Sequence, residues 1–163
     1  MANRIIAGVV AGAAGTVALN IAAYLDMLAR GRPPSKLPAQ LASKIADEVG
    51  LPLDFDLGGE LTETDEQSAV DNRTEALGAL LGYASGLGIG TAYGILRLVV
   101  PRPPAWLAGA AMGSLAMAAA DYPAARLALT DPRSWSGADW MADVVPQMVY
   151  GVTTALVFEQ IRK

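Results

Sequence analysis

Residues 76–96 read ALGALLGYASGLGIGTAYGIL and contain no charged side chain over 21 positions. Three further stretches also lack charge: residues 5–25, 103–120 and 144–158. A helix of about 20 apolar residues is long enough to cross the hydrocarbon core of a bilayer. We therefore predict an all-α, integral membrane four-helix bundle, with spans near residues 5–29, 76–100, 105–129 and 139–160 and a long loop over residues 30–75.

Two other interpretations of the apolar stretches fit less well. Arg4 followed by an apolar run is typical of a secretory signal, but this run is too long and has no cleavage-like ending. A soluble helical bundle would show a polar stripe every 3.6 residues, and residues 76–96 show none. Basic residues flank both sides of the predicted spans in similar numbers, so they leave the orientation in the membrane open.

The composition excludes several kinds of chemistry. The chain has no Cys and no His, which removes thiolate nucleophiles, disulfides, Cys/His zinc sites and histidine acid/base catalysis. The net charge is −4 and no basic stripe is present, so nucleic acid is not an expected partner. We expect no cofactor and no enzymatic activity.

Glycine recurs every four residues along the second predicted span. The first span carries a matching line of Gly8, Gly12, Thr16, Asn20 and Tyr24. Small residues allow helix backbones to approach closely in lipid, where van der Waals contact is the main source of helix association. We predict helix packing at these glycines, either within one chain or in a homo-oligomer: Gly78, Gly82, Gly86, Gly90 and Gly94.

An internal repeat relates the two halves of the chain. Residues 15–19 (GTVAL) align with residues 113–117 (GSLAM) at an offset of 98, and a Tyr-Gly pair at 93–94 recurs at 150–151. Each unit is then a two-span hairpin, and the two hairpins are parallel because each returns the chain to its starting side. The repeat predicts a pseudo-symmetric bundle.

The Gly-rich spans and the segment QMVYG at residues 147–151 resemble small bacterial inner-membrane proteins of the YagU-like group. The resemblance covers the four spans. It implies a multi-pass protein of the inner (plasma) membrane and brings no activity with it. Where such relatives are expected to carry a histidine, this chain has Gln147, so no shared chemistry is carried over.

The loop between the first two spans divides into a helical part and an acidic part. Apolar residues recur every four positions from Leu37 to Val49, with Ser35 as the expected N-cap and Gly50 as the expected stop. We expect an amphipathic helix that lies flat at the headgroups or covers the mouth of the bundle. Residues 53–66 only imitate a calcium loop and lack its required ligands, so we predict a solvated acidic run and no metal site.

Three carboxylates lie within or beside the spans, where a charge costs a few kcal/mol. Asp26, Asp121 and Asp143 all fall on the side that carries the odd-numbered loops, and Asp121 is the deepest. Two prolines in the same half, Pro123 and Pro146, free backbone carbonyls one turn earlier. Further polar side chains could line a vestibule there: Asn20, Tyr24, Tyr83, Tyr122 and Gln147.

This vestibule has two interpretations. It is a site for a proton or a small cation, with Asp121 as the main residue. Alternatively, Arg126 neutralises one carboxylate while Asp26 and Asp143 stay hydrated near the interface.

Two functions follow from these features. The leading hypothesis is a non-enzymatic subunit or accessory protein that acts through helix packing, with the lipid bilayer and other membrane subunits or copies of itself as partners. The competing hypothesis is a small oligomeric proton or cation channel or carrier that uses the intramembrane aspartates.

Overall fold

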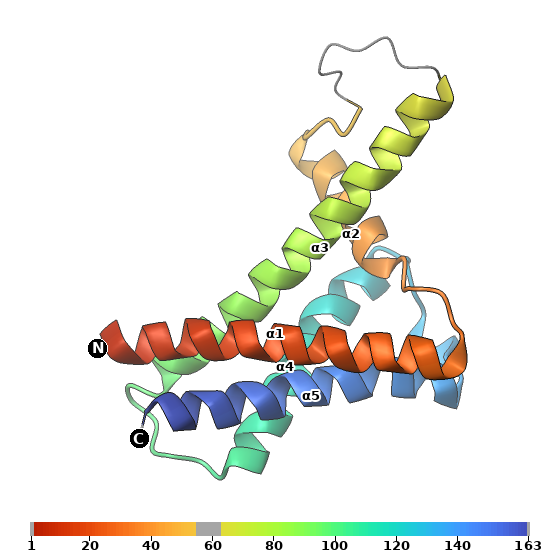
Figure 1. The fold of residues 1–163 in the computed structure, drawn as a ribbon. Helices are drawn as coiled ribbons and strands as arrows, with labels where there is room; N and C mark the ends of the chain where they lie inside the picture. The colour runs from red at the N-terminus through yellow and green to blue at the C-terminus, as the bar shows by residue number, and fades with distance from the viewer. Residues whose placement is uncertain (1, 55–62, 163) are drawn as a thin grey trace.

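The structure is a computed structural model and describes residues 2–54 and 63–162. Within these ranges the chain is all helical and has no strand. These residues form five α-helices (Figure 1) and one short 3-10 turn, with the following bounds: α1 Ala2–Arg30, α2 Leu37–Val49, α3 Glu63–Leu96, α4 Ala105–Arg126, η1 Pro132–Ser134 and α5 Gly137–Ile161.

Local sequence signals explain where several helices begin and end. Ser136 and Asp139 form a reciprocal capping box at the start of α5, which satisfies backbone N–H groups that have no partner within the helix. Gly50 ends α2 in the left-handed conformation with φ 69°, as expected for a helix stop. The third span was expected over residues 105–129, but α4 ends at Arg126. The chain leaves the helical conformation there, and Ala128 adopts a positive φ of 54°.

The four long helices pack in the spatial order α3, α1, α5, α4. Figure 1 shows α1 and α5 side by side and antiparallel, with the two chain ends near each other, while α3 and α4 cross them obliquely. The contact between α1 and α5 is extensive, whereas α3 and α4 barely touch. A two-fold relation between the hairpins would make these contacts equivalent, so the structure does not form the predicted pseudo-symmetric bundle.

Three helices are long and apolar enough to cross a membrane: Asn3–Arg30, Asp65–Leu96 and Gly137–Ile161. The fourth expected span, α4, is not among them. Its alanines are only weakly apolar, and Trp106, Asp121 and Tyr122 lower its mean hydropathy further. Length and composition therefore indicate a membrane-associated protein with three clear candidate spans.

The outer surface supports membrane association. Large apolar side chains point outward along the helices, including Val17 and Ile21, each 54% exposed, and Leu115, 53% exposed. Soluble monomers rarely expose contiguous apolar surface on this scale. Lipid tails, which are as apolar as these side chains, would cover this surface without cost.

Three glycines of α3 lie where this helix crosses α1. A Cβ added at Gly90 would lie 2.5 Å from the carbonyl oxygen of Gly8 and 2.6 Å from the Cα of Gly12. Gly86 and Gly94 are equally tight, against Thr16 and the backbone of Arg4. At Gly90 the two backbones approach this closely because Gly8 and Gly12 also lack side chains, whereas at Gly86 the near neighbour is the Oγ1 of Thr16.

The other two glycines of the predicted set have different surroundings. Gly78 faces α2, because a Cβ there would lie 2.8 Å from the carbonyl carbon of Pro38. A Cβ at Gly82 would meet nothing within 4 Å. The prediction that Gly82 packs against a helix is therefore wrong for contacts within this chain, since Gly82 lies between the part of α3 that meets α2 and the part that meets α1.

Tyr150 is the central residue of the core. Its side chain is 1% exposed and its hydroxyl donates a 2.6 Å hydrogen bond to the carbonyl of Gly86. The ring also fills the space beside Gly15 of α1, where a Cβ would lie 2.8 Å from a ring carbon. One side chain of α5 thus holds α1 and α3 together.

The expected amphipathic helix exists, but it presents an unexpected face to the protein. Ala42 and Ala46 are buried, and α2 packs mainly along α3, while Ile45 and Val49 are 37% and 71% exposed. Lys36 occupies the N-cap position without a side-chain cap, while the hydroxyl of Ser35, the predicted N-cap, accepts a 3.3 Å hydrogen bond from the backbone N–H of Leu37. Small residues pack against α3 because they allow close approach, which leaves the larger apolar side chains facing outward.

Candidate functional site

Asp121 and Asp143 come together where α4 packs against α5. Asp121 lies near the end of α4 and is 9% exposed, and its carboxyl group interacts directly with that of Asp143 near the start of α5. Glycines allow the two helices to approach, since a Cβ at Gly113 would lie 2.7 Å from the carbonyl oxygen of Gln147. The contact between the two carboxyl groups therefore depends on a close helix crossing.

Three side-chain oxygens in this region are buried and accept no hydrogen bond: Asp121 Oδ2, Asp143 Oδ2 and Gln147 Oε1. Gln147 follows Asp143 by four residues, so the two side chains share one face of α5. A buried acceptor without a donor costs about 1–3 kcal/mol, and more when it is charged. Pro146 lies within α5 and has no N–H, so the carbonyl of Ala142 also lacks its helical donor.

Asp26 is not part of this pair. Its Oδ2 accepts hydrogen bonds of 2.5 Å from both Arg30 and Arg32, so its charge is balanced locally at the end of α1. Its inclusion among the candidate site residues is therefore corrected. Two basic residues within six positions of Asp26 supply the partners, and Arg30 also donates to the carbonyl of Ala138, which ties α1 to the start of α5.

Tyr122 also lies away from the carboxyl pair. It is 62% exposed, and its hydroxyl accepts a 3.0 Å hydrogen bond from Nε of Arg126, which also stacks over the ring at 5.3 Å. Among the described residues Arg126 forms no salt bridge. The expectation that Arg126 neutralises one of the carboxylates is therefore wrong, because this arginine pairs with Tyr122 on the outer face of α4.

Asn20 lies at the same level as the site but on α1. In the antiparallel pair of α1 and α5, Gly15 contacts Tyr150 and Arg30 contacts Ala138. Asn20 lies between these two contacts on α1, so it lies at about the same height as Gln147 on α5. Its side chain is half-buried. No contact between Asn20 and either carboxyl group is seen.

The chemistry of the site is dominated by carboxyl oxygens that lack donors. The two carboxyl groups meet, the amide of Gln147 lies one helical turn further along the same face of α5, and no basic side chain pairs with the carboxyl groups in residues 2–54 and 63–162. The same ranges hold no group of three or more His, Cys, Asp or Glu side chains suited to a metal ion. Such a cluster can hold a proton between its oxygens or a small cation.

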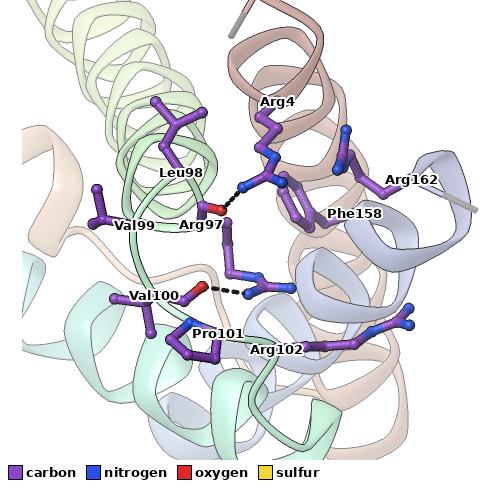
Figure 2. Close-up of a pocket in the computed structure, with 9 residues that line it drawn as sticks. All are labelled: Arg4, Arg97, Leu98, Val99, Val100, Pro101, Arg102, Phe158 and Arg162. Carbon is purple, nitrogen blue, oxygen red and sulfur yellow. Dashed lines mark hydrogen bonds between the residues drawn. The ribbon is translucent and has the colours of Figure 1, made fainter.

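A second polar region, which the sequence analysis did not single out, lies at the opposite end of the helices. It is a pocket of about 410 Å³. Four arginines from α1, the α3–α4 connection and the end of α5 line it (Figure 2): Arg4, Arg97, Arg102 and Arg162. One indication of this pocket was present in the sequence: all four arginines flank the predicted spans on the same side.

No protein-family model, curated protein or solved structure matches this chain.

Proposed function

We propose that this chain is a small multi-pass membrane protein in which Asp121 and Asp143 bind and transfer a proton or a small cation. The single observation that carries the proposal is the presence of three buried oxygen atoms without a donor at the α4–α5 contact. A protein that needed these residues only for stability would place a basic side chain or a backbone N–H beside them. Asp26 of the same chain has such partners.

The contact between the two carboxyl groups limits what the occupant can be. Two carboxylates in contact away from water repel each other, and a proton or a cation between them removes the repulsion. Gln147 Oε1 and the free carbonyl of Ala142 add uncharged oxygens, which suit a monovalent cation or a hydrated proton. Carboxyl groups at membrane depth typically mark proton relays or ion pathways.

The membrane arrangement is part of the same proposal. At 1.5 Å per residue, the 22 residues of α4 span about 33 Å, enough for the roughly 30 Å hydrocarbon core. With α4 as a fourth span beside the three clear candidates, the acidic pair lies between two membrane helices. The plasma membrane is the proposed location, in agreement with the resemblance to YagU-like proteins.

The accessory-subunit hypothesis has less support. It relied on the glycines of α3 as a surface for a partner helix, but α1 already covers Gly86, Gly90 and Gly94, and α2 covers Gly78. On α3 only Gly82 and Gly88 remain open, and two separate glycines are a small basis for a specific interface. We also propose that the chain is not an enzyme.

Flux measurements in liposomes test the proposal. The purified chain is reconstituted into liposomes that enclose a pH-sensitive dye, and a potassium gradient with valinomycin drives protons inward. A parallel set of liposomes encloses a sodium- or potassium-sensitive dye. We expect flux of one of these ions, and we expect Asp121→Asn and Asp143→Asn each to reduce it at least tenfold.

Asp26→Asn is the matched control, because Asp26 is a carboxylate at the same end of the bundle that is already paired with two arginines. This variant should retain the wild-type flux. The Asp121 and Asp143 variants should fold at least as well as the wild type, since each removes a buried acid with an unpartnered oxygen. Flux that is absent in the wild type, or equal in all four proteins, would refute the proposal.

A further inference from the structure

We propose that the arginine pocket binds a phosphate group, in the form of the headgroup of an anionic phospholipid. The pocket is bounded by the start of α1, the residues that follow α3 and the end of α5. This proposal does not depend on the carboxyl pair, which lies at the opposite end of the helices.

The pocket carries a local excess of positive charge. Four arginines line it, and the only acidic partner that they contact in residues 2–54 and 63–162 is Glu159. Arginine stays protonated at any physiological pH and presents a planar fork of N–H donors that matches two phosphate oxygens at once. Four positive charges around one carboxylate give the pocket a net positive charge, which attracts an anion.

Two of the arginines are held in place by the protein. Arg97 donates to Glu159 at 3.1 Å and to the carbonyl of Val100 at 2.8 Å, and its guanidinium lies 6.0 Å from the centre of the Phe158 ring. Arg4 donates to the carbonyl of Arg97. These contacts keep the floor of the pocket fixed before any ligand arrives.

The other two arginines are available to a ligand. Arg102 is 61% exposed at its side chain and contacts Glu159 through its Nη2. Arg162 is exposed, and its side chain forms no hydrogen bond or ion pair with any described residue. The Nε of Arg97 adds a buried donor that has no partner in the described part of the chain. Donors in excess of acceptors are the requirement for binding an oxyanion.

The remaining lining of the pocket favours a lipid over free phosphate. Val99, Val100 and Pro101 form an apolar side next to the guanidinium groups, and Val99 is 82% exposed. The candidate spans α3 and α5 end beside this pocket, which places it where hydrocarbon gives way to headgroups. Basic pockets between membrane helices recognise anionic headgroups in this way, with the acyl chains beside the apolar residues.

Binding is measured on the full chain in mild detergent, by native mass spectrometry and by the shift of the thermal unfolding midpoint. The probes are phosphatidylglycerol, phosphatidylcholine and inorganic phosphate. We expect retained phosphatidylglycerol and a higher midpoint, with little effect of phosphatidylcholine. The variant Arg102→Gln/Arg162→Gln should weaken phosphatidylglycerol binding at least tenfold. Both side chains are exposed, so this variant should fold normally.

The control is Arg126→Gln/Arg133→Gln, which removes the same charge from the opposite end of the molecule. If inorganic phosphate binds with the same dependence on Arg102 and Arg162, the site is a phosphate site and its lipid source is refuted. If neither probe binds, or if the control pair weakens binding as much as the pocket pair, the proposal is overturned.

Discussion

Replacing Gly90 by alanine tests whether α1 and α3 are held together by direct backbone contact. The added Cβ would lie 2.5 Å from the carbonyl oxygen of Gly8 and 2.8 Å from the amide nitrogen of Gly12. An ordinary contact begins near 3.4 Å, so the methyl group is about 0.9 Å too close to the carbonyl oxygen. Both neighbours are backbone atoms, which cannot rotate away, so the helices must separate.

The size of the effect follows from two opposing contributions. Placing an extra methyl group in a tight contact costs about 1–3 kcal/mol. Moving the two helices apart to make room for it also loses roughly a quarter to a half of the energy of each neighbouring van der Waals contact. Alanine gains about 1 kcal/mol over glycine through its higher helix propensity. Gly82→Ala has the same gain without the clash, because a Cβ at Gly82 meets nothing within 4 Å. The difference between the two variants should therefore be about 2 kcal/mol.

The assay uses the absence of cysteine in the chain. Cysteines introduced at the exposed positions Ile6 and Ile95 take a donor and an acceptor fluorophore only at those two sites, on α1 and α3. Titration with a denaturing detergent then follows the separation of the two helices by energy transfer. Gly90→Ala should lower the midpoint relative to Gly82→Ala. Equal midpoints for the two variants would refute close backbone packing at this crossing.

Further substitutions at three places in the fold have expected outcomes in the same unfolding assay. Tyr150→Phe should lower the free energy of unfolding by about 1 kcal/mol, since it removes one buried hydrogen bond and keeps the ring. Ala46→Leu should cost about 1–3 kcal/mol and expose α2 to protease, whereas Val49→Ser should leave α2 in place because Val49 is 71% exposed. Glu159→Leu should cost about 3 kcal/mol because it leaves the guanidinium of Arg97 buried without its carboxylate, and Arg97→Met in addition should restore part of the loss.

The helices themselves could be predicted from the sequence because their signals are local. A charge-free stretch and a helix stop such as Gly50 act within a few residues, so the predicted spans agree with α1 and α5 to within a few residues at each end. The helix that continues from the acidic loop into the second span is also present, as α3. The predicted second and third spans, 76–100 and 105–129, run a few residues past the ends of α3 and α4 at Leu96 and Arg126, and the end of α4 depends on Ala128, which carries no strong stop signal.

The carboxyl pair could be predicted only in part. The sequence showed that Asp26, Asp121 and Asp143 belong to the same end of the helices, because depth follows from position along a helix. Which of them meet depends on how each helix is rotated and on how α4 is aligned against α5. Those two quantities brought Asp121 to Asp143, whereas Asp26 pairs with Arg30 four residues further along the same helix, which is a local contact.

Local patterning was enough to establish an all-helical chain with long apolar segments and small residues that permit close packing. The helix α2 shows what local patterning could not predict. The spacing of Ile45 and Val49 correctly predicted a helix, but it did not predict which face of that helix packs against α3. Contacts between distant segments are set by the fit of whole surfaces, which no short window of sequence contains. Packing of the helices therefore settled which glycines touch another backbone, which carboxyl groups meet, and where four arginines surround a pocket.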